Sequence, residues 1–286
     1  MKKNNAKRRI AIPILIIAFS LIIISCILFL VYTFSGNYIN IAKIDDSAKN
    51  ATVADATNSN AIIVNGIVLG ASKDNKWISA EKFYEANGTL SELEVNVFSQ
   101  NSQYGTFKTA SLKKYDNSVI YTTLAKESVP TSYLALTSNK AVKVMPGMTK
   151  LEATEEDEDY VRDAIGSYDL LNGSVKVLEV YASNIQQVTD KIICATCESP
   201  NILGAYSAVV YVTGTEAYLV KYAYVRDTED SDRWPIYSLQ FVMDLNLDSK
   251  PEIVLQETTG NDTSYSVLEL RDENTFYEVL RSTIEI

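Results

Sequence analysis

This sequence of 286 residues contains no histidine. Without histidine the chain has neither a Ser-His-Asp nor a Cys-His catalytic centre, and it has no histidine-ligated zinc or iron site. Catalysis or metal binding by this chain would therefore have to use side chains other than imidazole.

Cysteine is scarce, and beyond the N-terminal region it occurs only in Cys194-Ala-Thr-Cys197. The apolar residues around this pair predict a strand, on which positions i and i+3 point to opposite faces with Cα atoms about 10 Å apart. A disulfide requires Cα atoms closer than about 7 Å, and no second cysteine pair is present to complete a zinc site. We expect two ordinary strand cysteines, with a redox pair as the alternative.

Common nucleophile motifs are also missing. The sequence has no Gly-x-Ser-x-Gly elbow and no phosphate-binding loop. These absences favour a protein that is not an enzyme. Serine and lysine are plentiful, so an envelope hydrolase with a histidine-free site, built from Ser/Lys or carboxylates, is the enzymatic alternative. Its structural sign would be a Lys Nζ within about 3.2 Å of a Ser Oγ in a pocket.

One long segment lacks charge altogether. Residues 10–34 carry no charged side chain, and five basic residues precede them in the stub 1–9. At about 1.5 Å per residue the run is long enough to cross a hydrocarbon core of about 30 Å. The basic stub predicts a cytoplasmic N-terminus. We therefore expect a single-pass anchor in the plasma membrane, with everything after Phe34 on the extracellular side.

A bacterial lipoprotein is the alternative to this anchor. Ile23-Ile24-Ser25-Cys26 resembles a lipobox, in which the cysteine would be lipidated and become the new N-terminus. The residues after Cys26 continue the apolar run instead of turning polar, which favours the uncleaved anchor.

The part outside the membrane is acidic. After Phe34 the chain has 21 basic and 36 acidic residues. This balance argues against binding to nucleic acid or to anionic lipid. It is compatible with a folded, solvated domain of the cell envelope.

Three segments are expected in the outer part. Residues 35–60 are rich in Asn, Ala, Asp, Ser and Thr without periodicity, which predicts a flexible linker. Residues 61–138 predict a small α+β module with a hairpin turn at Asn65-Gly66 and a helix capped by Ser79. Residues 150–286 predict a β-rich module with an N-terminal helix, since the acidic residues of 152–159 suit the positive end of a helix dipole. A cation patch is the alternative reading of that acidic stretch.

From residue 174 onward the pattern is nearly all β, and short turns predict antiparallel meanders. The expected strands are 175–181, 192–197, 205–212, 217–225, 236–243, 252–256, 265–270 and 276–280. The fold class is thus a single transmembrane helix followed by an extracytoplasmic α+β part that is mainly antiparallel β.

These strands contain a weak internal repeat. Ala205-Tyr206-Ser207 matches Ser264-Tyr265-Ser266 at an offset of 59 residues, and the following strands keep that offset. We expect two related four-strand units, about 169–227 and 233–286, in a meander or blade-like arrangement. Chance similarity of tyrosine-rich strands is the alternative.

Only the second unit holds the motif Asp244-Leu-Asn246-Leu-Asp248-Ser-Lys250-Pro-Glu252. Side-chain oxygens fall at positions 1, 3, 5 and 9, and the Lys250 carbonyl falls at position 7. Alternating hard oxygens in one short loop match the six or more ligands that calcium requires. The motif predicts a structural calcium site, with a bare polar turn as the alternative.

This motif and the apolar strand after it resemble the Asp-x-Asn-x-Asp-Gly-x-x-Glu loops of FG-GAP/VCBS-type β modules, which occur in integrin-like propellers and bacterial surface proteins. The resemblance covers about residues 234–280. It implies that Asp244, Asn246, Asp248 and Glu252 would be the side-chain ligands of calcium.

The loop departs from that family at its turn glycine, which is Ser249 here. Glycine adopts a left-handed backbone freely, whereas serine does so at a cost of about 1 kcal/mol or more. We also expect Leu245 and Leu247 to point into the protein while the ligands converge on the ion.

Together these observations predict a membrane-anchored binding or scaffolding protein of the bacterial cell envelope. Its partner would be a wall polymer, a peptide or another envelope protein. Besides the hydrolase, the second alternative is a subunit of a membrane complex that uses its apolar helix for contacts. The anchor lacks an evident small-xxx-small face, which disfavours this alternative.

Overall fold

The computed structural model describes residues 42–100, 102–115, 119–124, 130–137, 148–166, 174–183, 185–186, 189–199, 204–225, 234–271 and 274–284. The expected stub 1–9, the anchor 10–34 and its alternative lipidation site Cys26 lie outside these residues. Within the described ranges, no helix has the length and apolar character needed to cross a membrane.

The described residues form three sheets, all within one compact unit, Tyr38–Ile286. The first meander sheet has the order β10-β11-β12-β13-β14: β10 Thr149–Leu151, β11 Val175–Ala182, β12 Lys191–Cys197, β13 Ala205–Thr213 and β14 Glu216–Val225. The second meander sheet has the order β1-β18-β17-β16-β15: β1 Lys43–Ile44, β15 Ile236–Met243, β16 Glu252–Thr259, β17 Asp262–Arg271 and β18 Thr275–Ile284.

The third sheet, which we call the N-terminal sheet, has the order β6-β5-β9-β2-β3-β8-β7, with β4 also paired to β3. Its strands are β2 Asn60–Val64, β3 Ile67–Lys73, β4 Lys76–Ser79, β5 Glu94–Ser99, β6 Ser102–Lys108, β7 Lys113–Lys114, β8 Ile120–Tyr121 and β9 Leu134–Leu136. The helices are α2 Ser47–Asn50, α3 Val53–Ala56, α4 Ala80–Asn87 and α5 Glu155–Gly166. Among the described strand pairs only β1–β18 is parallel, so the predicted antiparallel β class is confirmed.

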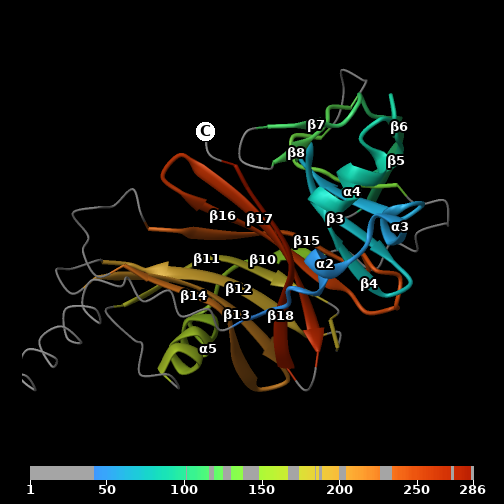
Figure 1. The fold of residues 1–286 in the computed structure, drawn as a ribbon. Helices are drawn as coiled ribbons and strands as arrows, with labels where there is room; N and C mark the ends of the chain where they lie inside the picture. Colours follow the sequence, from blue (N-terminus) through green and yellow to red (C-terminus); the bar gives the residue numbers. More distant parts are fainter. Residues whose placement is uncertain are drawn as a thin grey trace, which may run out of the picture. The chain divides into compact units, whose positions relative to one another are not determined.

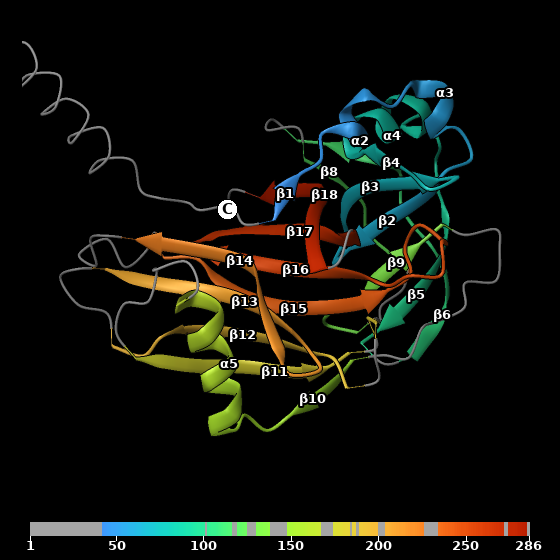
Figure 2. The same ribbon diagram turned by 90° about the horizontal axis from the view of Figure 1, so that it is seen from below.

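The second meander sheet lies in the middle of the described part (Figures 1 and 2). One of its faces shares a core with the first meander sheet, in which Leu255 packs with Ile192. Its other face shares a core with the N-terminal sheet, in which Val254 packs with Leu69. Helix α5 covers the outer face of the first meander sheet, and α3 and α4 cover that of the N-terminal sheet.

This middle position explains a run of apolar residues in β16. Ile253 and Leu255 face the first meander sheet, and Val254 between them faces the N-terminal sheet. Because successive residues of a strand point to opposite faces, a strand buried on both sides is apolar at every position.

Most local predictions for the β-rich part agree with the structure. All eight expected strands from residue 174 onward occur, with ends that differ by at most a few residues. The acidic stretch begins helix α5, as expected, and Asp157 within it accepts from the Thr154 N–H (2.9 Å) and from Lys191 Nζ (2.8 Å). Ser79 caps α4, and Asn65-Gly66 forms the β2–β3 turn with positive φ at both residues.

The expected flexible linker 35–60 differs from the structure over residues 42–60. From Ala42 the chain forms β1, α2 and α3, and Ala42, Ala48 and Ala56 are buried. Four-residue helices and a two-residue strand leave no periodic pattern in a sequence, and they are held here by tertiary contacts. The module 61–138 shares a core with the second meander sheet.

Candidate metal centre

The loop between β15 and β16, residues 244–251, lies at the junction of the second meander sheet and the N-terminal sheet. Leu245 is fully buried in the core shared by the two sheets, as expected. Ser72 Oγ donates to the Leu245 carbonyl (2.7 Å) and ties the loop to β3. Leu247 was expected to point inward as well, but it is 38% exposed. Its left-handed backbone, with a φ of 67°, breaks the alternation that the expectation assumed.

Asp244 and Asn246 shape this loop. The Asp244 carboxylate accepts from the backbone N–H groups of Asp248 (3.1 Å) and Ser249 (2.9 Å), and Asn246 Oδ1 accepts from the Asp248 N–H (2.9 Å). Burial raises the pKa of Asp244, although these backbone N–H groups oppose the rise. Both side chains therefore use their oxygens on the backbone of the loop itself.

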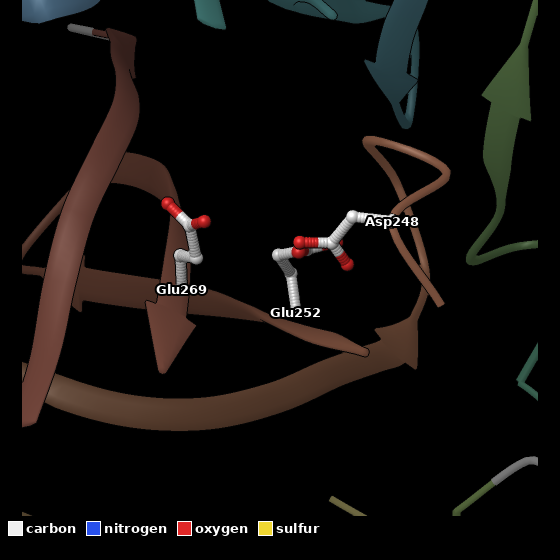
Figure 3. Close-up of side chains that lie close together, drawn as sticks. All are labelled: Asp248, Glu252 and Glu269. Atoms are coloured by element: carbon white, nitrogen blue, oxygen red, sulfur yellow. The ribbon is translucent and has the colours of Figure 1, made fainter. Parts of the chain in front are cut away.

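Three carboxylates converge where the loop meets strands β16 and β17 (Figure 3). Ligand oxygens of Asp248, Glu252 and Glu269 all lie within 4.8 Å of one another. Asp248 and Glu252 belong to the predicted ligand set, and Asp244 is not part of this group. Lys250 is exposed and donates its backbone N–H to Asp248 Oδ1 (2.8 Å).

Glu252 is the most unusual member of this group. Its side chain is 0% exposed, Oε2 accepts from the Leu245 N–H (2.6 Å), and Oε1 has no hydrogen-bond partner among the described residues. Burial, with the nearby charges of Asp248, Asp244 and Glu269, raises its pKa well above the ordinary value. A buried carboxylate oxygen without a donor is unfavourable, and a cation at this point would satisfy it.

Glu269 connects the group to the N-terminal part of the chain. Its Oε2 accepts from Trp77 Nε1 (3.0 Å) on β4 and from Arg271 Nε (2.8 Å). Arg271 also donates to Asp45 Oδ2 (2.6 Å), which precedes α2. The sequence motif did not reveal Glu269, because it lies 17 residues after Glu252 on the neighbouring strand.

The donor set suits a hard cation. Carboxylate oxygens are preferred ligands of calcium, which takes six to eight oxygens at about 2.3–2.6 Å. Asp248, Glu252 and Glu269 would hold the ion, and water or backbone carbonyls would complete its coordination. Such an ion would join the loop to strands β16 and β17.

The structure also bears on the hydrolase alternative. Lys221 Nζ lies 3.2 Å from Ser266 Oγ, which meets the distance that we set for a Ser/Lys site. Both side chains are only 4% exposed, however, and neither lines either of the two described cavities. Lys221 is also ion-paired with Glu278, so its ammonium donates to Ser266. This arrangement joins β14 to the second meander sheet.

Neither of the two cysteines of the described part forms a disulfide. Cys194 lies in the core between the meander sheets, and Cys197 lies in the core beneath α5. They point to opposite faces of β12, as expected for ordinary strand cysteines.

No protein-family model matches this chain, and neither a curated protein nor a solved structure matches it. The interpretation of the carboxylate group therefore rests on its own geometry and charge.

Proposed function

We propose that the protein is a membrane-anchored binding or scaffolding protein of the bacterial cell envelope, and that calcium stabilises its outer part. The observation that carries the calcium proposal is the buried, unpaired Oε1 of Glu252 beside the carboxylates of Asp248 and Glu269. The resemblance of residues 234–280 to an FG-GAP/VCBS-type module supports the same ion.

The position of these carboxylates favours a structural role for the ion. Glu252 is fully buried, and Glu269 is held by Trp77 and Arg271. A bound ion would thus stabilise the junction between the second meander sheet and the N-terminal sheet. Substrate could not reach Glu252 without opening that junction.

The proposed location rests on the uncharged run 10–34 and on the basic stub before it. The acidic composition of the outer part supports a wall polymer or another envelope protein as the partner, and it disfavours nucleic acid. Protease treatment of intact cells tests the topology, because the chain beyond Phe34 should be digested. Recovery of a product that begins at a lipid-modified Cys26 would contradict the uncleaved anchor and would show that the protein is a lipoprotein.

Thermal unfolding of the full chain in detergent, with millimolar calcium and with chelator, tests the ion. Binding to the folded state alone stabilises it by about 2.7 kcal/mol at a hundredfold excess over Kd. Asp248→Asn should remove most of that gain, since it weakens a ligand and removes a charge.

Asp262→Asn is the matched control, because Asp262 is an exposed acid at the start of β17 outside the carboxylate group. It should leave the calcium response intact. Identical melting with calcium and with chelator would contradict the proposed ion and leave a polar turn.

A further inference from the structure

The first described segment of the chain, Ala42–Asn50, is attached to the second meander sheet by few contacts. It consists of β1, a turn and α2, and β1 lies beside β18 (Figure 2). Their parallel pairing covers two residues, and the Asp45 N–H adds one bond to the Glu278 carbonyl (3.0 Å). Within this described segment only Ala42 and Ala48 are buried, and both side chains of β1 are exposed. Because two alanine side chains bury little apolar area, the segment can open without unfolding the sheet.

An ion pair provides the strongest polar contact between this segment and the sheet. Arg271 Nη1 donates to Asp45 Oδ2 (2.6 Å), and the side chains of Asp45 and Arg271 are only 17% and 34% exposed. The Arg271 guanidinium also lies over the Tyr277 ring, 4.8 Å from its centroid, and Lys43 Nζ lies 5.4 Å from the same centroid. Partial burial reduces screening of the ion pair by water and salt, so the pair contributes much of the attachment.

The same guanidinium is bonded to the candidate metal centre. Arg271 Nε donates to Glu269 Oε2 (2.8 Å), and the Glu269 carboxylate converges with those of Asp248 and Glu252. Contacts therefore run from the carboxylate group through Glu269 and Arg271 to Asp45. Because the guanidinium is planar and rigid, the position of Glu269 determines where Arg271 can meet Asp45.

A cation in the carboxylate group and the docked segment should strengthen each other. The ion would hold Glu269 in one position and would thereby hold Arg271 against Asp45. Docked Asp45 offsets the positive charge of Arg271, which would otherwise repel a cation at Glu269. Coupling between two sites is reciprocal, so a segment that strengthens calcium binding is itself held more firmly when calcium is bound.

We propose that calcium in the carboxylate group keeps the segment Ala42–Asn50 docked on β18, and that loss of calcium releases it. This inference rests on the proposed calcium site and on the proposed anchor 10–34. With the segment docked, residues 35–41 connect the anchor to the folded part, whereas residues 35–50 do so after release. At about 3.5 Å per extended residue, the maximum reach of this connection grows from roughly 25 Å to roughly 55 Å. Calcium would therefore set how far from the membrane the protein can bind its partner.

Hydrogen exchange of the full chain in detergent, with calcium and with chelator, tests this inference. The amides of residues 42–50 should exchange about fivefold more slowly with calcium, at the lower end of typical coupling because Arg271 is partly exposed. The capped helix α3 is the internal control, since it is as short as α2 but packs against the N-terminal sheet. Its exchange should be equal in calcium and in chelator.

Asp45→Asn tests the contacts that connect the two sites. It removes the ion pair with Arg271 and retains an oxygen for the Ser47 N–H, which donates to Asp45 Oδ1 (2.8 Å). Calorimetric titration should show calcium binding weakened about fivefold, and calcium should no longer slow exchange of the segment. Asp46→Asn is the matched control, because this neighbouring acid is 62% exposed and pairs with Lys49. It removes the same charge one residue away and should leave both measurements unchanged.

The outcomes separate this inference from the proposed ion. A calcium-dependent rise in melting temperature, with equal exchange of residues 42–50 in calcium and in chelator, would support the ion and overturn the coupling. Equal slowing of α3 and of the segment would indicate general stabilisation and would also overturn it. So would an Asp46→Asn variant that weakens calcium binding as much as Asp45→Asn, since only long-range charge would then be involved. If calcium changed neither melting nor exchange, the ion and the coupling would both be contradicted.

Discussion

Both meander sheets contain a buried acid, but the groups around the two acids differ. Each has a buried acid where its second meander strand begins: Asp190 precedes β12, and Glu252 opens β16. Asp190 Oδ2 accepts from the Gln186 N–H (2.6 Å) and from the Tyr211 hydroxyl (2.8 Å), both within its own sheet and loop. Glu252 accepts from one backbone N–H and faces two further carboxylates. The first sheet thus gives its acid two protein donors, whereas the second gives its acid one donor and places two carboxylates beside it.

The two meanders differ at one pair of positions in the expected repeat. At the offset of 59 residues, Glu269 aligns with Val210. Val210 packs in the apolar core beneath α5, whereas Glu269 faces the N-terminal sheet and meets Trp77 and Arg271. An acid is tolerated at this position only because its neighbours donate to it.

The largest effect should come from separating the two meander sheets. Lys221 of the first sheet is ion-paired with Glu278 of the second, and both side chains are buried. Lys221→Met would leave Glu278 without its main partner, and the loss of a buried partner costs about 3–5 kcal/mol. Arg281, 3.7 Å from Glu278, should keep the loss near the lower end. Urea unfolding measures it.

Lys176→Met is the control for this variant, because Lys176 is exposed on β11 of the same sheet. It should change the free energy of unfolding by less than about 0.5 kcal/mol. If Lys221→Met were equally mild, the ion pair would not join the sheets.

A smaller loss of stability should come from removing a hydrogen-bond donor of the buried acid in the first meander sheet. Tyr211→Phe removes the hydroxyl that donates to Asp190, and a hydrogen bond to a charged group contributes about 1.5–3 kcal/mol. This loss should be the same in calcium and in chelator, since Tyr211 and Asp190 belong to the first meander sheet and not to the carboxylate group. Tyr218→Phe, which alters an exposed hydroxyl bonded to Glu216, should cost much less. If the stability lost in Tyr211→Phe depended on calcium, the two buried acids would not differ in their response to calcium.

The contrast also shows what could be predicted from sequence. Alternation and turn residues predicted the strands of both meanders, because these features depend on neighbours within about ten residues. The packing of Leu69 against Val254 could not be predicted, since the two residues belong to different sheets and no local pattern links them. The ordered segment after Ala42 was missed for the same reason, because β1 forms only by pairing with β18.

The candidate site was predictable in part. The spacing of the motif identified Asp248 and Glu252, but it gave equal weight to Asp244 and Asn246, whose oxygens accept from the loop backbone. Glu269 became evident only from the pairing of β16 with β17. One indication of Glu269 was present in the sequence, namely that it aligns with the apolar Val210 in the expected repeat.

The dependence of stability on pH tests the raised pKa of Glu252 directly. Its raised pKa means that the folded state retains a proton that the unfolded state releases above about pH 4.3. In chelator, stability should therefore fall as pH rises from there toward the raised pKa, by at most about 1.4 kcal/mol per pH unit. Calcium needs ionised Glu252, so the fall should be shallower with calcium. Glu252→Gln should flatten most of it, with Asp244 supplying the remainder.

Other acids do not obscure this test. The pKa values of Asp45 and Asp157 are lowered from 3.8, and burial opposes the hydrogen bonds and charges that lower them. Their stabilising contributions are lost only as pH falls below about 4, outside the window of Glu252. The pH dependence of stability in chelator should therefore change in Glu252→Gln between about pH 4.5 and 7. An unchanged profile would contradict the raised pKa of Glu252.

The smallest effect concerns the backbone of the metal-centre loop. Ser249 has a φ of 75°, a left-handed conformation that costs an L-residue about 1–2 kcal/mol. Ser249→Gly relieves this cost and keeps the N–H that donates to Asp244 Oδ2, while the greater freedom of glycine in the unfolded chain offsets part of the gain. The net stabilisation should be about 1 kcal/mol. Ser199→Gly, at an exposed serine with negative φ, should instead be slightly destabilising.

The effect of calcium on the stability gained by Ser249→Gly tests whether the left-handed backbone at Ser249 forms without the ion. If hydrogen bonds to Asp244 and Asn246 hold the loop without an ion, the gain in melting temperature should be equal in calcium and in chelator. A gain seen only with calcium would mean that the ion imposes the left-handed backbone. In that case the variant should also bind calcium more tightly, by about fivefold for 1 kcal/mol. We expect the equal gain, because four backbone N–H groups of the loop already donate to its own side chains or to Glu252.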